Sequence, residues 1–178
     1  MMSFILLMGL IGIVFLLYFK KPILSIVSEN HGIVSKLQDS KWFQDYRLAG
    51  VFLFGINAVL FISTILMLYG LTLLTIPYVH LIIMLFAVVV SIYFWLVVHK
   101  SWKGSRMERV KMSLIGISFY IGSTLLFIYW LVTLTPSYPG EDTFIIAIGL
   151  ILAIIVTSVA CIVCFIITGI TKDRLSRG

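Results

Sequence analysis

The segment His99-Lys-Ser-Trp-Lys-Gly-Ser-Arg-Met-Glu-Arg-Val-Lys111 separates two long stretches that carry no formal charge. It contains five of the thirteen lysine and arginine residues of the chain. Residues 48–98 before it form an uncharged run of 51 residues, and residues 112–140 after it form one of 29. Because a helix needs about 20 apolar residues to cross the hydrocarbon core of a bilayer, this pattern indicates a chain that crosses a membrane several times.

The composition supports the same class of protein. Of the 178 residues, 61% are hydrophobic and 11% are charged, against about 45–50% and about 25% in a typical soluble protein. A water-soluble fold could not bury so much apolar surface, so the lipid bilayer is the expected environment. The net charge of +6 does not predict a nucleic-acid partner, because the basic residues lie between apolar stretches and not along one exposed face.

An all-α integral membrane protein with five transmembrane helices is predicted, as an N-terminal anchor followed by two helical hairpins. The predicted spans are residues 3–19, 49–69, 78–98, 112–134 and 144–170. They leave two cytoplasmic linkers, residues 20–47 and residues 99–111. In the first linker, Trp42, Phe43 and Tyr46 predict an interfacial anchor on a connector that lies at the membrane surface, or alternatively on a helix that docks a partner.

The distribution of lysine and arginine predicts the orientation. The first linker has five of them, the second has five and the C-terminal tail has three, whereas the short turns between paired spans have none. Because basic residues accumulate on the cytoplasmic side, the N-terminus is expected outside and the C-terminus in the cytoplasm. The compact loops and the lack of a glycosylation sequon favour a bacterial cytoplasmic membrane.

Asn57 carries the only side-chain amide within a predicted span. Lipid offers it no hydrogen-bond partner, so the amide needs a partner in the protein. A displacement of the chain by 66 residues lays Asn57 on Ser123, which suggests that the two hairpins are parallel repeats. Asn57 and Ser123 are therefore candidates either for a polar path through the protein or for a hydrogen bond between helices.

The last predicted span contains a row of small residues. The row consists of Gly149, Ala153, Thr157, Cys161 and Cys164. Small residues at helical spacing let the backbones of two membrane helices approach closely. The alternative is redox chemistry, because Cys161-Ile-Val-Cys164 resembles the tetrapeptide of the vitamin K epoxide reductase family. The resemblance covers those four residues; that family relays electrons through a second cysteine pair, and this chain has two cysteines.

Other candidate sites are weaker. The basic residues of the central segment are predicted either to contact anionic lipid headgroups or only to set the topology: Lys100, Lys103, Arg106, Arg109 and Lys111. His80 and His99 are expected near opposite membrane interfaces, about 29 Å apart along one helix, which excludes a shared metal or haem. No cofactor is predicted, and Ser123 has no base within reach for nucleophilic catalysis.

The sequence thus favours a protein without catalytic chemistry that acts through helix–helix contacts. It would be an accessory, assembly, immunity or regulatory subunit, and its partner would be another membrane protein or a second copy of itself. One alternative is a small homo-oligomeric transporter or channel for an uncharged or weakly polar solute. A second alternative, based on Cys161 and Cys164, is a membrane protein with thiol or quinone redox activity.

Overall fold

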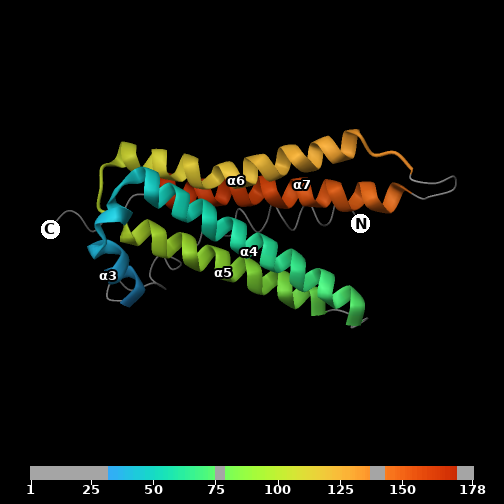
Figure 1. Cartoon of the computed structure of the whole chain (residues 1–178), viewed down its shortest axis with the longest axis horizontal. Coiled ribbons are helices and arrows are strands. Elements are labelled where there is room, and N and C mark those ends of the chain that lie inside the picture. The colour runs from blue at the N-terminus through green and yellow to red at the C-terminus, as the bar shows by residue number, and fades with distance from the viewer. Residues whose placement is uncertain (1–31, 75–78, 137–142, 172–178) are drawn as a thin grey trace.

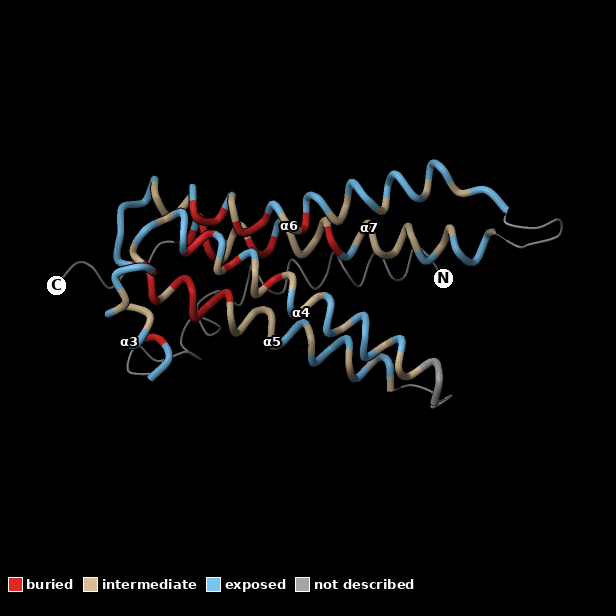
Figure 2. The backbone as a smooth tube through the Cα atoms, in the orientation of Figure 1, coloured by how far each residue is buried: buried red, intermediate tan, exposed pale blue. Residues whose placement is uncertain are grey.

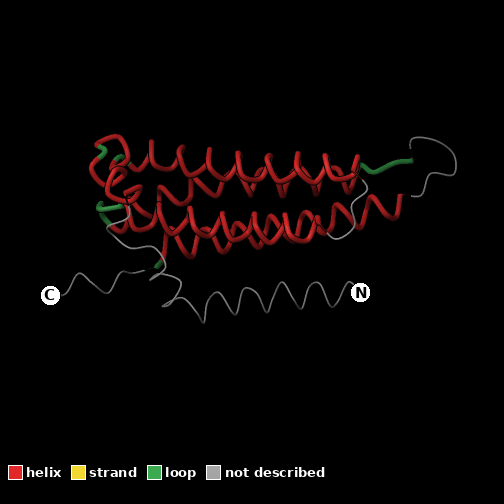
Figure 3. The backbone as a smooth tube through the Cα atoms, turned by 90° about the horizontal axis from the view of Figure 1, so that it is seen from below, coloured by secondary structure: helices red, strands yellow, loops and turns green. Residues whose placement is uncertain are grey.

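The computed structural model of the chain describes residues 32–74, 79–136 and 143–171. This part of the chain is helical apart from short connections, and it contains no strand (Figure 3). The predicted first span, residues 3–19, lies outside the described residues.

The described elements follow one another in the order shown in Figure 1. They are α3 (Gly32–Asp39), the 3-10 helix η1 (Lys41–Gln44), α4 (Tyr46–Leu74), α5 (Val79–Ser101), α6 (Arg106–Val132), α7 (Thr143–Phe165) and the π-helix η2 (Ile166–Ile170). Four stretches of the described chain are long and apolar enough to cross a membrane: Tyr46–Leu71, Ile82–Ser101, Arg106–Val132 and Thr143–Ile170. The prediction of an all-helical protein with several membrane-spanning helices is confirmed to this extent.

The four long helices form two hairpins, α4–α5 and α6–α7. Helix α4 packs along α6, and these two helices connect the hairpins. The hairpins lie together at the end that carries α3 and diverge toward the other end (Figure 1). We call the first of these ends the base. Buried residues gather in the half of the molecule next to the base, as Figure 2 shows.

Two glycines allow α4 and α6 to approach closely near the base. A Cβ atom on Gly50 would lie 2.7 Å from the Cβ of Ile115. A Cβ atom on Gly116 would overlap the side chain of Leu53. Both positions therefore require glycine, because any side chain would push the two helices apart.

The segment before α4, which the sequence predicted as a connector at the membrane surface, covers the base. Val34 of α3 and Phe43 of η1 are completely buried, and α3 packs against α5. The side-chain amides of Gln38 and Gln44 donate to the carbonyls of Lys100 (2.9 Å) and Ser101 (3.2 Å). The last carbonyls of a helix have no partner within the helix, so the segment also caps α5.

The predicted linker of residues 99–111 is mostly helical, and only residues 102–105 separate α5 from α6. Ser105 and Glu108 form a capping box that starts α6: Glu108 N donates to Ser105 Oγ (3.3 Å), and Ser105 N donates to Glu108 Oε2 (3.1 Å). His99, which the sequence placed at the membrane interface, is fully buried within the protein.

Candidate functional site

Asn57 is the centre of a buried polar junction near the base. Its side chain is completely buried. Its carbonyl oxygen accepts a hydrogen bond from Trp95 Nε1 (2.8 Å), and its Nδ2 donates to the backbone carbonyl of Gly116 (3.1 Å). The same Nδ2 also lies 3.8 Å from the sulfur of Cys164. One side chain of α4 therefore contacts partners on α5, α6 and α7.

The absence of a side chain on Gly116 makes this junction possible. Gly116 brings α6 so close to α4 that its carbonyl oxygen lies within reach of the Asn57 amide. That carbonyl can accept the bond in addition to its bond within α6, because a carbonyl oxygen has two lone pairs. The indole of Trp95 supplies only a donor, so its hydrogen bond fixes which way the Asn57 amide points.

Two further hydrogen bonds link α6 to the last helical segment. Ser113 Oγ and Thr168 Oγ1 of η2 are 2.7 Å apart, and Thr124 Oγ1 donates to Thr157 Oγ1 of α7 at 2.8 Å. Gly169 of the π-helix also lies against Ser113, since a Cβ atom on Gly169 would be 3.1 Å from Ser113 Oγ. These bonds, like those of Asn57, join one helix to another.

The structure does not bring Ser123 to Asn57. Ser123 Oγ donates to the carbonyl of Phe119 within its own helix (2.9 Å). Ser123 lies seven residues beyond Gly116 on α6, which is about 10 Å farther from the base at 1.5 Å per residue. The α6 partner of Asn57 is the carbonyl of Gly116, which sequence reasoning missed because a backbone atom carries no signal in the sequence.

The small-residue row of α7 is closed near the base and open toward the other end. Thr157 and Cys164 are buried among the neighbouring helices, and Cys161 is half-buried. Both cysteines are free thiols. Gly149, at the outer end of the row, is exposed, and a Cβ built on it would have no atom within 4 Å. Ala153 between these regions is half-buried.

The basic residues of the central segment lie at the base, and some of them have structural contacts. Arg109 Nη1 donates to the carbonyl of Thr171 at 3.1 Å. The ammonium group of Lys111 lies 5.5 Å from the ring centroid of Tyr46, a cation–π distance. Lys100 is half-buried. The remaining two, Lys103 and Arg106, are exposed.

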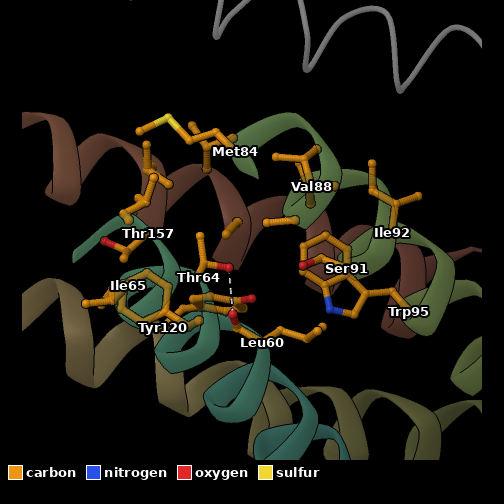
Figure 4. A pocket seen from close by; sticks show the side chains of 17 residues that line it. Leu60, Thr64, Ile65, Met84, Val88, Ser91, Ile92, Trp95, Tyr120 and Thr157 are labelled. Atoms are coloured by element: carbon orange, nitrogen blue, oxygen red, sulfur yellow. Dashed lines mark hydrogen bonds between the residues drawn. The ribbon is translucent and has the colours of Figure 1, made fainter. Parts of the chain in front are cut away.

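A pocket of about 330 Å³ lies between the two hairpins. Figure 4 shows Met84 and Val88 of α5 across from Leu60 of α4, with Trp95 and Tyr120 also in its wall. Helix α7 contributes Val156, Thr157, Val159, Ala160 and Val163. The wall is almost entirely apolar, and the indole N–H of Trp95 is already bonded to Asn57. This pocket therefore suits apolar groups better than polar ones.

The polar groups gathered around Asn57 make hydrogen bonds between helices, and the two thiols lie beside them on α7. Among these residues no group of three histidine, cysteine, aspartate or glutamate side chains is arranged to hold a metal ion. No family model, curated protein or solved structure matches this chain.

Proposed function

We propose that this protein is a non-enzymatic subunit that binds another membrane protein through contacts between transmembrane helices. The observation that carries this proposal is the open outer end of the small-residue row at Gly149. Near the base the same row packs inside the protein. A helix of a partner can approach closely at Gly149 and Ala153, because small residues leave room for a second backbone.

The use of the buried polar groups supports this proposal. The hydrogen bonds of Asn57, of the Ser113–Thr168 pair and of the Thr124–Thr157 pair all join one helix to another. These polar side chains are therefore used to hold the helices together. An interior of this kind suits a scaffold that holds two hairpins in place for a partner.

The proposal includes a topology of five spans, with residues 3–19 as the first, the N-terminus outside and the C-terminus in the cytoplasm. The described lysines and arginines support it, because all of them lie in elements that meet at the base: Lys36, Lys41, Arg47, Lys100, Lys103, Arg106, Arg109 and Lys111. The base is then the cytoplasmic end, in a bacterial cytoplasmic membrane.

The test is gentle extraction from native membranes, followed by native mass determination of the intact complex. We expect a second polypeptide in fixed stoichiometry with the parent protein and its loss from Gly149→Leu. Gly122→Leu is the matched control, because Gly122 is an exposed glycine of α6 with equally open surroundings. A protein that is purely monomeric, or a second polypeptide that Gly149→Leu retains, would contradict the proposal.

The pocket favours a second candidate, a homo-oligomeric transporter or channel for an uncharged solute. Because the wall of the pocket is apolar, the solute that it suits best is an apolar one. A native mass that corresponds to several copies of this chain alone would favour it. Ala160→Trp would then fill the pocket and abolish flux in proteoliposomes, whereas unchanged flux would exclude the pocket as the path.

The redox alternative concerns Cys161 and Cys164. It predicts that the double substitution Cys161→Ala with Cys164→Ala abolishes thiol or quinone redox activity.

A further inference from the structure

The four described spans leave one side of the bundle uncovered. Helix α5 packs on α4, and α7 packs on α6, but α5 and α7 have no comparable contact with each other above the base. At the base, α5 touches η2 and α3. The pocket lies between α5 and α7 at this uncovered side, with Val88 on one wall and Ala160 on the other.

We propose that residues 3–19 of the same chain occupy the groove between α5 and α7 and close the pocket. This inference rests on the proposed five-span topology and goes beyond it, because it names the place of the first span. The groove would then hold a helix of this chain, and its pocket would not be a path for a solute. The structure would thus favour the first candidate function over the second.

Length and connectivity select this occupant. Residues 3–19 are 17 residues without a charge, which is about 25 Å as a helix. The described chain begins at α3, which lies at the base against α5 and so next to the groove. The twelve residues between them, 20–31, need only pass from the cytoplasmic end of the first span to α3. A helix from a second copy of the protein would lack this covalent connection to α3.

The charged ends of the spans give the depth at which contacts should form. Met8 lies twelve residues before Lys20, Val88 twelve before Lys100, and Ala160 twelve before Lys172. At 1.5 Å per residue each is about 18 Å from the base. Gly9 follows at that depth, where it would let two helices approach closely. A span this short does not reach the outer end of α7, so Gly149 stays open to a partner.

Disulfide cross-linking of the full chain in native membranes tests the proposal. In a background of Cys161→Ala with Cys164→Ala, each of residues 8–11 is changed in turn to cysteine and combined with Val88→Cys or Ala160→Cys. The control combines the same changes with Val59→Cys. Val59 lies twelve residues after Arg47 on α4 at the same depth, and it is 64% exposed against 53% for Val88. By helical periodicity it faces away from the α4 residues that line the pocket.

We expect an intrachain disulfide with Val88→Cys and with Ala160→Cys at one or more of the four positions. Its yield should be at least about fivefold above that with Val59→Cys, because cysteines whose Cα atoms are more than about 7 Å apart cannot be bridged. Disulfides that form only between two chains would show that a second copy fills the groove and would overturn the proposal. No disulfide at any position would overturn it as well and would leave lipid as the occupant.

Maleimide labelling of the same cysteines distinguishes a wrong place for the first span from a wrong five-span topology. If cysteines at positions 8–11 react with a water-soluble maleimide in intact membranes, residues 3–19 are not a span, and the five-span topology fails together with this proposal. If they are protected but do not cross-link, the topology holds and only the place of the first span is wrong. The native mass of the complex tests the partner contact in either case.

Discussion

The hydrogen bond between Trp95 and Asn57 should contribute measurably to the stability of the four-helix unit. Asn57→Ala removes the acceptor of the Trp95 indole (2.8 Å) and the donor to the Gly116 carbonyl (3.1 Å). Side-chain hydrogen bonds between membrane helices contribute about 0.6 kcal/mol on average and at most about 1.7 kcal/mol. The two bonds together therefore correspond to about 1–3 kcal/mol of the free energy of unfolding.

The two hydrogen-bond partners of Asn57 should not contribute equally to the loss of stability in Asn57→Ala. The Gly116 carbonyl can keep a bond within α6, whereas the indole N–H of Trp95 is left without the acceptor it has in the parent protein. A buried donor without a partner costs about 1–3 kcal/mol. We therefore expect most of the loss to come from the Trp95 side and a total of about 2 kcal/mol for Asn57→Ala.

A double-mutant cycle with Trp95→Phe isolates the pair. Phenylalanine keeps an aromatic ring beside Tyr120 (centroids 6.3 Å apart in the parent) but has no N–H to leave unsatisfied. The coupling energy should be about 1.5 kcal/mol, so Asn57→Ala should cost that much less in the Trp95→Phe background. Far-UV circular dichroism during unfolding by SDS in mixed micelles measures each free energy.

Ser123→Ala is the control for loss of a polar group within a span, because the Ser123 hydroxyl bonds only within its own helix among its described contacts. We expect it to cost less than about 0.5 kcal/mol, as is usual for substitutions away from buried networks. An equal cost of Asn57→Ala in both backgrounds would show that the Trp95 bond does not stabilise the protein. A cost no larger than that of Ser123→Ala would refute the junction altogether.

Three further predictions concern the base. Gly116→Ala should lower the free energy of unfolding by about 1–3 kcal/mol, because its methyl group would overlap α4; Gly122→Ala, in open surroundings, should be neutral or slightly stabilising in the same SDS titration. Ser113→Ala should cost about 0.6–1.7 kcal/mol through loss of its bond to Thr168, and an unchanged midpoint would contradict this. Cys164, which is completely buried, should react with a membrane-permeant maleimide only after denaturation, as mass spectrometry would show; rapid labelling of folded protein would mean that the junction opens.

The four long apolar helices of the described chain could be predicted from the sequence because a bilayer imposes a simple rule. Within lipid, backbone polar groups must bond to each other and charges are excluded, so long uncharged runs become helices. The rule does not apply at the base, where water and protein both compete for polar groups. There the charge pattern predicted a linker through residues 99–111, but α5 continues to Ser101 and α6 begins at Arg106. Ser105 and Glu108 carried the missed signal, the spacing of a capping box.

The sequence predicted that Asn57 needs a hydrogen-bond partner, but it did not predict which groups are its partners. That Asn57 needs a partner follows from its position in a span, and the two hypotheses, a polar path and an interhelical bond, both begin there. Its actual partners depend on the rotation of four helices about their axes, which no local pattern encodes. Trp95 is one of many aromatic residues in the spans, and Gly116 contributes a backbone atom. For the same reason the pocket could not be predicted, since its wall combines residues of all four helices.

The close contacts within this chain lie near the base, whereas the proposed partner contact at Gly149 lies toward the other end of α7. Gly50, Gly116 and the Asn57 junction hold the hairpins together near the base, whereas the outer ends diverge. Substitutions at the base should therefore change the free energy of unfolding. A substitution at Gly149 should change assembly with the partner and leave the free energy of unfolding unchanged. If Gly149→Leu instead unfolds the protein, the outer end of α7 is packed within this chain, and the partner must bind another surface.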